Sequence, residues 1–278
     1  MRSLGLFVVM LGFLVACNVS SDRAYSEEAA PLQVAKRYVT DVETALSHAG
    51  LSLQWDDAEV KSPSDDPNSF AVRVPVGDQG NTYLHVDVFR GEAKGALIIG
   101  YDSTKTSAEI LNLDYNTISI VTNLQTHEPE VVRTSDQSTR ILQTVVQALS
   151  SAKVAPLNPG VAALIHGIRE DSAISLLCSA ADAPMYSALL SAVDNLNAAV
   201  DRMYDALDAY EVAAAAMWAA CSACAAGVVG MCGPCAGLTV AYFAARDAFY
   251  DAVDAVDYWS DQVDSCQEQV SDWVAANC

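Results

Sequence analysis

Residues 214–245 read AAAMWAACSACAAGVVGMCGPCAGLTVAYFAA, and this stretch decides how the C-terminal part of the chain folds. It contains four of the eight cysteines, arranged as Cys221-x2-Cys224-x7-Cys232-x2-Cys235. Glycines and a proline interrupt its centre, where one helix is expected to end and the next to begin. The stretch therefore predicts the tip of an antiparallel helical hairpin.

The segments on either side have the apolar periodicity of two long helices. Apolar residues recur at alternating steps of four and three, which keeps them on one stripe of a helix. They are Leu189, Val193, Leu196, Val200, Met203, Leu207, Tyr210, Ala214, Met217 and Cys221 in the first arm, and Leu238, Tyr242, Ala245, Phe249, Ala252, Val256, Trp259, Val263, Cys266, Val270 and Trp273 in the second. Asp182 followed by Pro184 is a start signal for the first arm. At about 40 residues, each arm should span roughly 60 Å.

The cysteine positions favour disulfides between the arms. In an antiparallel hairpin, two residues face each other when their numbers have a constant sum. The same sum is shared by the pairs Cys224–Cys232, Cys221–Cys235 and Cys178–Cys278. Facing helix positions can bring Cα atoms within the ~7 Å that a bridge needs, so we predict these three bridges. Four cysteines allow three pairings, and a zinc site is the alternative, although seven residues is a short spacer for one.

The first 17 residues are typical of an export signal. Arg2 supplies the positive charge, and an apolar core from Leu4 to Val15 follows it. This core is too short to span a bilayer. Leu14-Val15-Ala16-Cys17 resembles a lipobox, the signal at which prokaryotic lipoproteins are cleaved and lipidated, so we expect lipid on Cys17. An ordinary signal peptide is the alternative. With either signal the mature chain is exported to a compartment in which disulfides persist.

The charge of the chain excludes some partners and suggests others. A net charge of −20 argues against nucleic acid, because phosphate binding needs a basic surface. Residues 171–278 contain 15 acidic residues and only two basic ones, Arg202 and Arg246, which gives a net charge of −13. The acids of the second arm recur every three or four residues: Asp247, Asp251, Asp254, Asp257, Asp261, Asp264, Glu268 and Asp272. They indicate a solvated face, a salty habitat that screens them, or a docking face for a basic protein partner.

The residues before the hairpin predict a small α+β domain. Residues 18–30 are polar and form a tether, and 31–152 form the domain. A helix is expected over 32–48. A second helix is expected after its capping residues Ser135 and Asp136, and its inner face extends to Leu149. Strands are expected at 70–76, 82–89, 96–101, 118–124 and 130–133, in one antiparallel sheet with helices on one face. Residues 153–160 form a linker, 161–181 are expected to be helical, and 161–278 are the cysteine-rich hairpin domain.

No set of residues in the chain predicts catalysis, a metal site or a cofactor. The four histidines are scattered, and the sequence has no phosphate loop, no nucleophile elbow and no HExxH. His85 and Asp87 share one face of a strand, a spacing that chance also produces. The aromatic residues that flank the tip are more often helix-packing residues than a ligand box: Tyr210, Trp218, Tyr242, Phe243, Phe249 and Tyr250.

The cysteine motif carries a family resemblance. Cys221-Ser222-Ala223-Cys224, followed after seven residues by Cys232 in an Ala/Gly-rich C-terminal segment, resembles the cysteine-rich bacteriocins of the microhalocin type, such as halocin C-eight. The resemblance covers roughly residues 178–278. It implies a precursor in which an export signal and an N-terminal domain precede a disulfide-rich toxin peptide, and in which the N-terminal part can confer immunity.

Two functions follow as expectations. In the first, the chain is a secreted, lipid-anchored bacteriocin-like precursor, whose hairpin is membrane-active and whose residues 32–151 shield it. The membrane- or partner-facing tip residues would be Met217, Trp218, Val228, Val229, Met231, Leu238, Tyr242 and Phe243. In the second, it is a non-enzymatic envelope lipoprotein that holds a protein partner with the coiled-coil hairpin. An uncharged, closed tip suits the first function, since a helical hairpin satisfies its own backbone hydrogen bonds.

Overall fold

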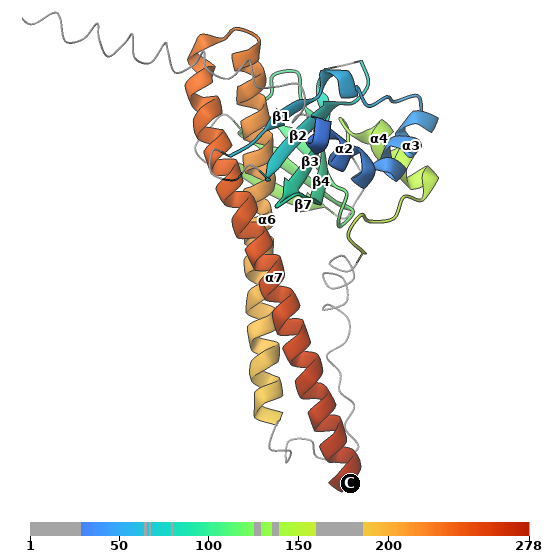
Figure 1. Cartoon of the computed structure of the whole chain (residues 1–278), viewed down its shortest axis with the longest axis vertical. Coiled ribbons are helices and arrows are strands. Elements are labelled where there is room, and N and C mark those ends of the chain that lie inside the picture. The colour runs from blue at the N-terminus through green and yellow to red at the C-terminus, as the bar shows by residue number, and fades with distance from the viewer. Residues whose placement is uncertain are drawn as a thin grey trace, which may run out of the picture.

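The computed structural model describes residues 29–63, 66, 68–78, 80–124, 129–134, 139–159 and 186–277. The expected signal peptide, the lipidation site at Cys17, the cap at Ser135 and Asp136, the helix at 161–181 and the bridge Cys178–Cys278 all lie outside these residues. Within them, an antiparallel sheet with helices is followed by two long helices packed together, as the sequence predicts (Figure 1).

One seven-stranded antiparallel sheet forms the centre of the N-terminal part. Its strands follow each other in space in the order of the sequence, from β1 to β7. They are β1 Glu59–Lys61, β2 Phe70–Pro75, β3 Thr82–Phe89, β4 Glu92–Tyr101, β5 Ala108–Asn112, β6 Thr117–Thr122 and β7 Glu130–Thr134. The sequence analysis missed β1 and β5. Arg90 and Gly91, with φ of 53° and 86°, form the two-residue turn that joins β3 to β4.

Three helices cover one face of this sheet. They are α2 Ala29–Tyr38, α3 Thr40–His48 and α4 Gln143–Ala152, and a single-turn helix, η1 Trp55–Asp57, follows α3. The expected helix over 32–48 is therefore divided between α2 and α3. The carboxylate of Glu109 on β5 accepts hydrogen bonds of 2.8–3.0 Å from the backbone N–H groups of residues 140–142, so a strand residue satisfies the free donors before α4.

The hairpin consists of α6 Tyr186–Ala225 and α7 Cys232–Asn277, joined through the short helix η3 Val229–Met231. Disulfides Cys221–Cys235 and Cys224–Cys232 link the two arms, with Cα atoms 4.7 and 4.8 Å apart. The predicted hairpin and these two predicted bridges are confirmed. Disulfides persist outside the cytoplasm, so the bridges suggest an oxidising compartment. None of the helices in the described residues is both long and apolar enough to cross a membrane.

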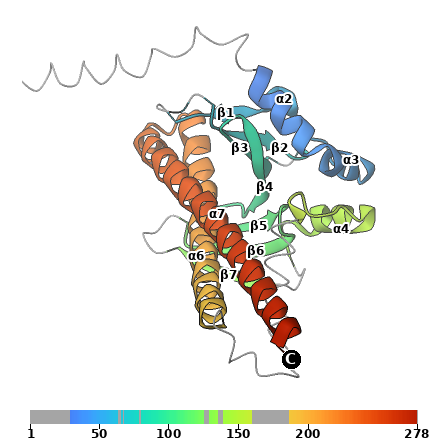
Figure 2. The same cartoon turned by 60° about the horizontal axis from the view of Figure 1, so that its bottom comes forward.

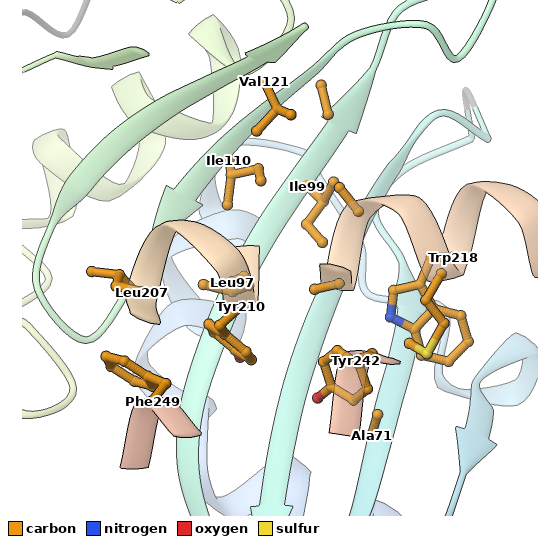
Figure 3. Close-up of a cluster of buried hydrophobic side chains, with 14 of the residues drawn as sticks. Ala71, Leu97, Ile99, Ile110, Val121, Leu207, Tyr210, Trp218, Tyr242 and Phe249 are labelled. Carbon is orange, nitrogen blue, oxygen red and sulfur yellow. The ribbon is translucent and has the colours of Figure 1, made fainter. Parts of the chain in front are cut away.

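The tip half of the hairpin covers the second face of the sheet (Figures 1 and 2). Alternate strand residues therefore enter two separate hydrophobic clusters. Leu84, Val86 and Ile98 pack under α2–α4, while Leu97, Ile99 and Ile110 pack under α6 and α7 (Figure 3). The α+β part thus has one core of its own and one that it shares with the hairpin. The assignment of residues 31–152 as a separate domain therefore stays a prediction.

The other half of the hairpin projects beyond the sheet (Figure 1). At its outer end the arms pack against each other through a small cluster centred on Leu189 and Val270 that also contains Cys266, while nearer the sheet Leu196, Met203 and Val256 still belong to the shared cluster. Cys266 is partly exposed and has no disulfide partner among the described residues. The eight acids of the second arm are all exposed. We call residues 186–203 and 253–277 the stalk.

The two tip disulfides should each contribute to stability. Removing Cys221–Cys235 as a double serine variant should lower the free energy of unfolding by about 3 kcal/mol, because the bridge closes a loop of 14 residues. Removing Cys224–Cys232 should lower it by about 2.5 kcal/mol, because that loop has 8 residues. Urea unfolding of the oxidised variants measures both. Free thiols at these four positions in the native protein, or stoichiometric zinc, would contradict the bridging.

Candidate functional site

The described residues contain one buried cluster of titratable side chains that joins the sheet to both arms of the hairpin. His85 and Asp87 point from β3 toward the hairpin, and each has 0% exposure. Tyr210 and Trp218 from α6 and Tyr242 from α7 contact them and are all buried. Figure 3 shows these three side chains against the sheet. We call these five residues the interface cluster.

The hydrogen bonds of the interface cluster form one directed chain. Trp218 Nε1–H, which can only donate, lies 2.9 Å from His85 Nδ1, so that nitrogen is an acceptor. The neutral ring then carries its proton on Nε2, 3.0 Å from the hydroxyl oxygen of Tyr242. Tyr242 and Tyr210 donate their hydroxyl protons to the two carboxylate oxygens of Asp87. Each polar side chain of the interface cluster therefore has a partner.

Electrostatics keep the donors and acceptors of this chain in those roles. Burial by itself raises the pKa of Asp87, but the neighbouring His85 and the hydroxyl donors Tyr210 and Tyr242 favour the ionised carboxylate, so the pKa is lowered. The carboxyl group is therefore ionised. Burial, followed by the charge of Asp87, raises the pKa of Tyr210 and of Tyr242 well above the ordinary value, so both remain donors.

Further polar contacts lie on either side of the cluster. Toward the tip, Arg73 on β2 donates to the hydroxyl of Ser222, and its guanidinium lies between the rings of Tyr83 and Trp218, 4.5 and 4.8 Å from their centroids. Tyr101 donates to the carbonyl oxygen of Ala215 over 2.7 Å. These groups fix the position of α6 along the sheet.

A second buried carboxylate lies toward the stalk. Glu211 has 0% exposure, and burial raises its pKa despite the nearby positive charge of Arg133. Asn112 donates to it over 3.2 Å, and Arg133 on β7 donates over 3.4 Å. Arg133 also pairs with Asp208 at 2.5 Å. These donors and acceptors again come from both the sheet and α6, so they bind the hairpin to the far edge of the sheet.

Gly95 on β4 allows α7 to approach the sheet. A Cβ atom at this position would lie only 2.7 Å from the hydroxyl of Tyr250 and 3.3 Å from Asp114 Oδ2. Asp114 is buried and accepts hydrogen bonds from Tyr38 at 2.5 Å and from the N–H of Ala96 at 2.8 Å. Burial raises the pKa of Asp114 to about 7 despite those hydrogen bonds. Asp114 thus links α2, on one face, to a site beneath α7, on the other.

The structure divides the eight expected tip residues into two groups. Met217, Trp218, Tyr242 and Phe243 are buried. Val228 is 52% exposed, and Met231 and Leu238 are partly exposed, while Val229 lies in η3. The aromatic members thus face the sheet, and the exposed members surround the turn. The structure brings both groups together with the two tip disulfides at one end of the hairpin.

The interface cluster is enclosed between the sheet and the hairpin. His85 and Asp87 are fully buried, and no described cavity is lined by either of them. Among the described residues, no group of three metal-ligating side chains lies together. The sequence analysis treated His85 and Asp87 as a chance pair. The available signal was that two polar residues share one face of a strand whose other residues are largely apolar.

Comparisons with protein-family models, with curated proteins and with solved structures find no match to this chain.

Removing one hydroxyl from the interface cluster should destabilise the protein. Tyr242→Phe takes a donor from Asp87 and an acceptor from His85, and both groups stay buried, so we expect a loss of about 1–3 kcal/mol. Tyr258→Phe is the matched control, because Tyr258 is 56% exposed on the stalk. It should change stability by less than about 0.5 kcal/mol. Equal stability of the two variants in urea unfolding would show that the cluster does not hold the hairpin.

Asp114 should make the stability depend on pH. Its pKa is about 7 in the folded chain, against an ordinary 3.8, so the folded chain holds a proton that the unfolded chain releases. The resulting stabilisation is complete below about pH 4 and is lost as the pH rises through 7. Asp114→Asn mimics the protonated form, so it should be more stable than the wild type at pH 8 and similar to it at pH 4. Parallel pH profiles of urea unfolding for the two proteins would contradict this assignment.

Proposed function

We propose that this chain is an exported, lipid-anchored, non-enzymatic precursor in which the α+β domain shields a membrane-active, bacteriocin-like hairpin. One observation carries the proposal. The large aromatic side chains near the tip are buried against the sheet, and the sheet supplies their polar partners His85 and Asp87. A shielding domain must cover the apolar face of its effector in this way.

The size of the covered surface supports shielding. Trp218, Tyr242, Phe243, Phe249 and Tyr250 are all buried in or beside the shared cluster. Aromatic side chains bury about 150–250 Å² each, so an undocked hairpin could expose up to roughly 1,000 Å² of aromatic surface. The largest apolar patch on a typical soluble monomer is about 300–600 Å². The hairpin without the sheet would therefore seek a membrane or another protein.

The polar contacts would make shielding specific. The buried carboxylate of Asp87 receives hydroxyl donors only from α6 and α7, so a different apolar surface cannot replace the hairpin without leaving a buried charge unpaired. The same dependence would keep the two parts together after the chain is cut in the connection between them. Immunity by a domain that stays bound is consistent with the microhalocin resemblance of the cysteine motif. Lipid on Cys17 would hold the precursor at the cell envelope until such a cut.

Vesicle leakage tests the shielding. We would place a specific protease site at residues 153–158, between α4 and the hairpin, and compare the intact protein, the cut protein and the cut protein with Tyr210→Phe and Tyr242→Phe. Only the last should release dye, because only there is the docking weakened. Leakage should increase with ionic strength, which screens the repulsion between the acidic stalk and anionic lipid.

Two controls make the result decisive. A cut protein with Tyr258→Phe should behave as the cut wild type, since Tyr258 lies on the stalk, away from the sheet. Reduction of the tip disulfides should abolish leakage by opening the tip. If the weakened, cut protein leaves vesicles intact at every salt concentration, the hairpin is not membrane-active.

A second function is favoured by the stalk. The stalk projects beyond the sheet with an exposed acidic face, and at its outer end the arms are packed together without help from the sheet (Figure 1). A rigid acidic arm could hold a basic protein partner while the rest of the chain forms a stable base. Mass spectrometry of the culture medium separates the two functions. A released fragment that begins between residues 153 and 185 supports the precursor, and its absence supports the partner-holding lipoprotein.

A further inference from the structure

The tip of the hairpin has a surface that the sheet leaves uncovered. Between residues 225 and 241, the exposed side chains are those of alanine, glycine, valine, proline and one bridged cysteine. Val228 is 52% exposed and Val240 is 71% exposed. We call this exposed part of residues 225–241 the tip surface. No residue of it carries a charge, in a chain whose net charge is −20.

The backbone of the turn is suited to a medium with little water. Ala226, Gly227 and Val228 donate their N–H groups to carbonyl oxygens of the last turn of α6, over 2.9–3.0 Å, and Met231 donates to Val228 over 2.8 Å. These amides therefore do not need water as a partner. An unpaired backbone group strongly opposes contact with lipid, so these four paired amides lower the cost of placing the turn at a membrane interface.

The path of the chain brings this end of the hairpin toward the lipid anchor. Cys17 lies 12 residues before the start of α2, so the connection spans at most about 43 Å. In both views α2 lies across the sheet from the tip half of the hairpin and at about its level, and the C-terminus lies at the opposite end (Figures 1 and 2). The 46 residues of α7 alone extend about 70 Å. An anchored protein can therefore stand with its tip at the membrane and its stalk away from it.

Charge favours that orientation over its alternatives. Lying flat, or with the stalk downward, the protein would bring the acids of the stalk against anionic headgroups, and repulsion acts within a Debye length of about 8 Å at physiological salt. With the tip downward, the uncharged tip surface meets the membrane first, and the nearest charges beside it include both signs, Lys61 and Asp66. A single acyl chain also gives only marginal membrane binding, so a second contact would strengthen the anchoring.

We propose that the tip surface rests on the membrane to which the chain is itself anchored, and that the stalk points away from it. The proposal rests on the lipid attachment at Cys17 that belongs to the proposed function. It requires no undocking, because the tip surface is exposed while the aromatic side chains remain beneath the sheet. The lipid surface is thus a partner of the folded precursor, separate from any target membrane of a released hairpin.

The test supplies the anchor artificially. The mature chain from Asn18, with an N-terminal hexahistidine, is bound to phosphatidylcholine vesicles that contain a nickel-chelating lipid, with or without phosphatidylglycerol. Val240→Trp places a reporter on the tip surface, and Tyr258→Trp places the matched reporter on the stalk. Brominated phosphatidylcholine should quench most of the emission added at position 240 and none of that added at position 258. Adding Val228→Asp should reduce the quenching at 240, whereas Leu190→Asp, on the stalk, should not.

The outcomes separate the two parts of the proposal. Equal quenching at 240 and 258, or none at 240, would overturn the orientation whatever Cys17 carries. Mass spectrometry of the native protein tests lipid on Cys17 independently. If quenching at 240 is found but no lipid, the tip surface still binds a membrane and the anchor must be sought elsewhere.

Discussion

The burial of Asp87 is the constraint on which the arrangement of the two parts depends. A charged carboxylate without solvent contact is tolerated only if hydrogen-bond donors surround it. Tyr210 and Tyr242 supply these donors from the two arms of the hairpin, and His85 lies beside Asp87 on the same strand. The sheet therefore cannot bury this face without the hairpin. Likewise, Trp218 has a partner for its indole N–H only where His85 is present.

The length of the hairpin determines which of its surfaces stay exposed once this interface has formed. The tip half is used as a second core for the sheet, and the disulfides hold its two arms together at the closed end. The outer end of the stalk packs without the sheet, and the stalk keeps its acids in solvent. The molecule thus has three chemically distinct surfaces: an aromatic one that is covered, an uncharged one at the tip, and an acidic one on the stalk. Each of the proposed functions uses one of them.

The hairpin could be predicted from the sequence because its signals are local or follow from simple symmetry. Heptad spacing defines the arms, glycines define the turn, and the mirror relation of the cysteines selects the pairing. The docking could not be predicted in the same way. The apolar stripe through which the two helices pack is continuous with the residues that contact the sheet. The sequence around Trp218 and Tyr250 therefore does not indicate whether they contact the other helix or the sheet.

One strand of the sheet could not be predicted for a similar reason. Strand β5 was missed because its residues AEILN alternate only weakly, and it is defined by its pairing with β4 and β6. The role of its Glu109 at the start of α4 is likewise a long-range one. His85 and Asp87 were visible as a polar pair within an apolar strand, but their meaning depends on three partners that lie more than 120 residues away in the sequence.

The central claim is that sheet and hairpin form one cooperative unit through the interface cluster. Native-state hydrogen exchange, followed by mass spectrometry of peptides at low denaturant, tests it most directly. Backbone amides of β3 and of residues 207–221 in α6 should open with the same free energy and the same denaturant dependence, while the stalk opens more easily. If the β3 amides exchange at a much lower free energy than those of 207–221, the hairpin is stable without the sheet, and the two parts are not one cooperative unit.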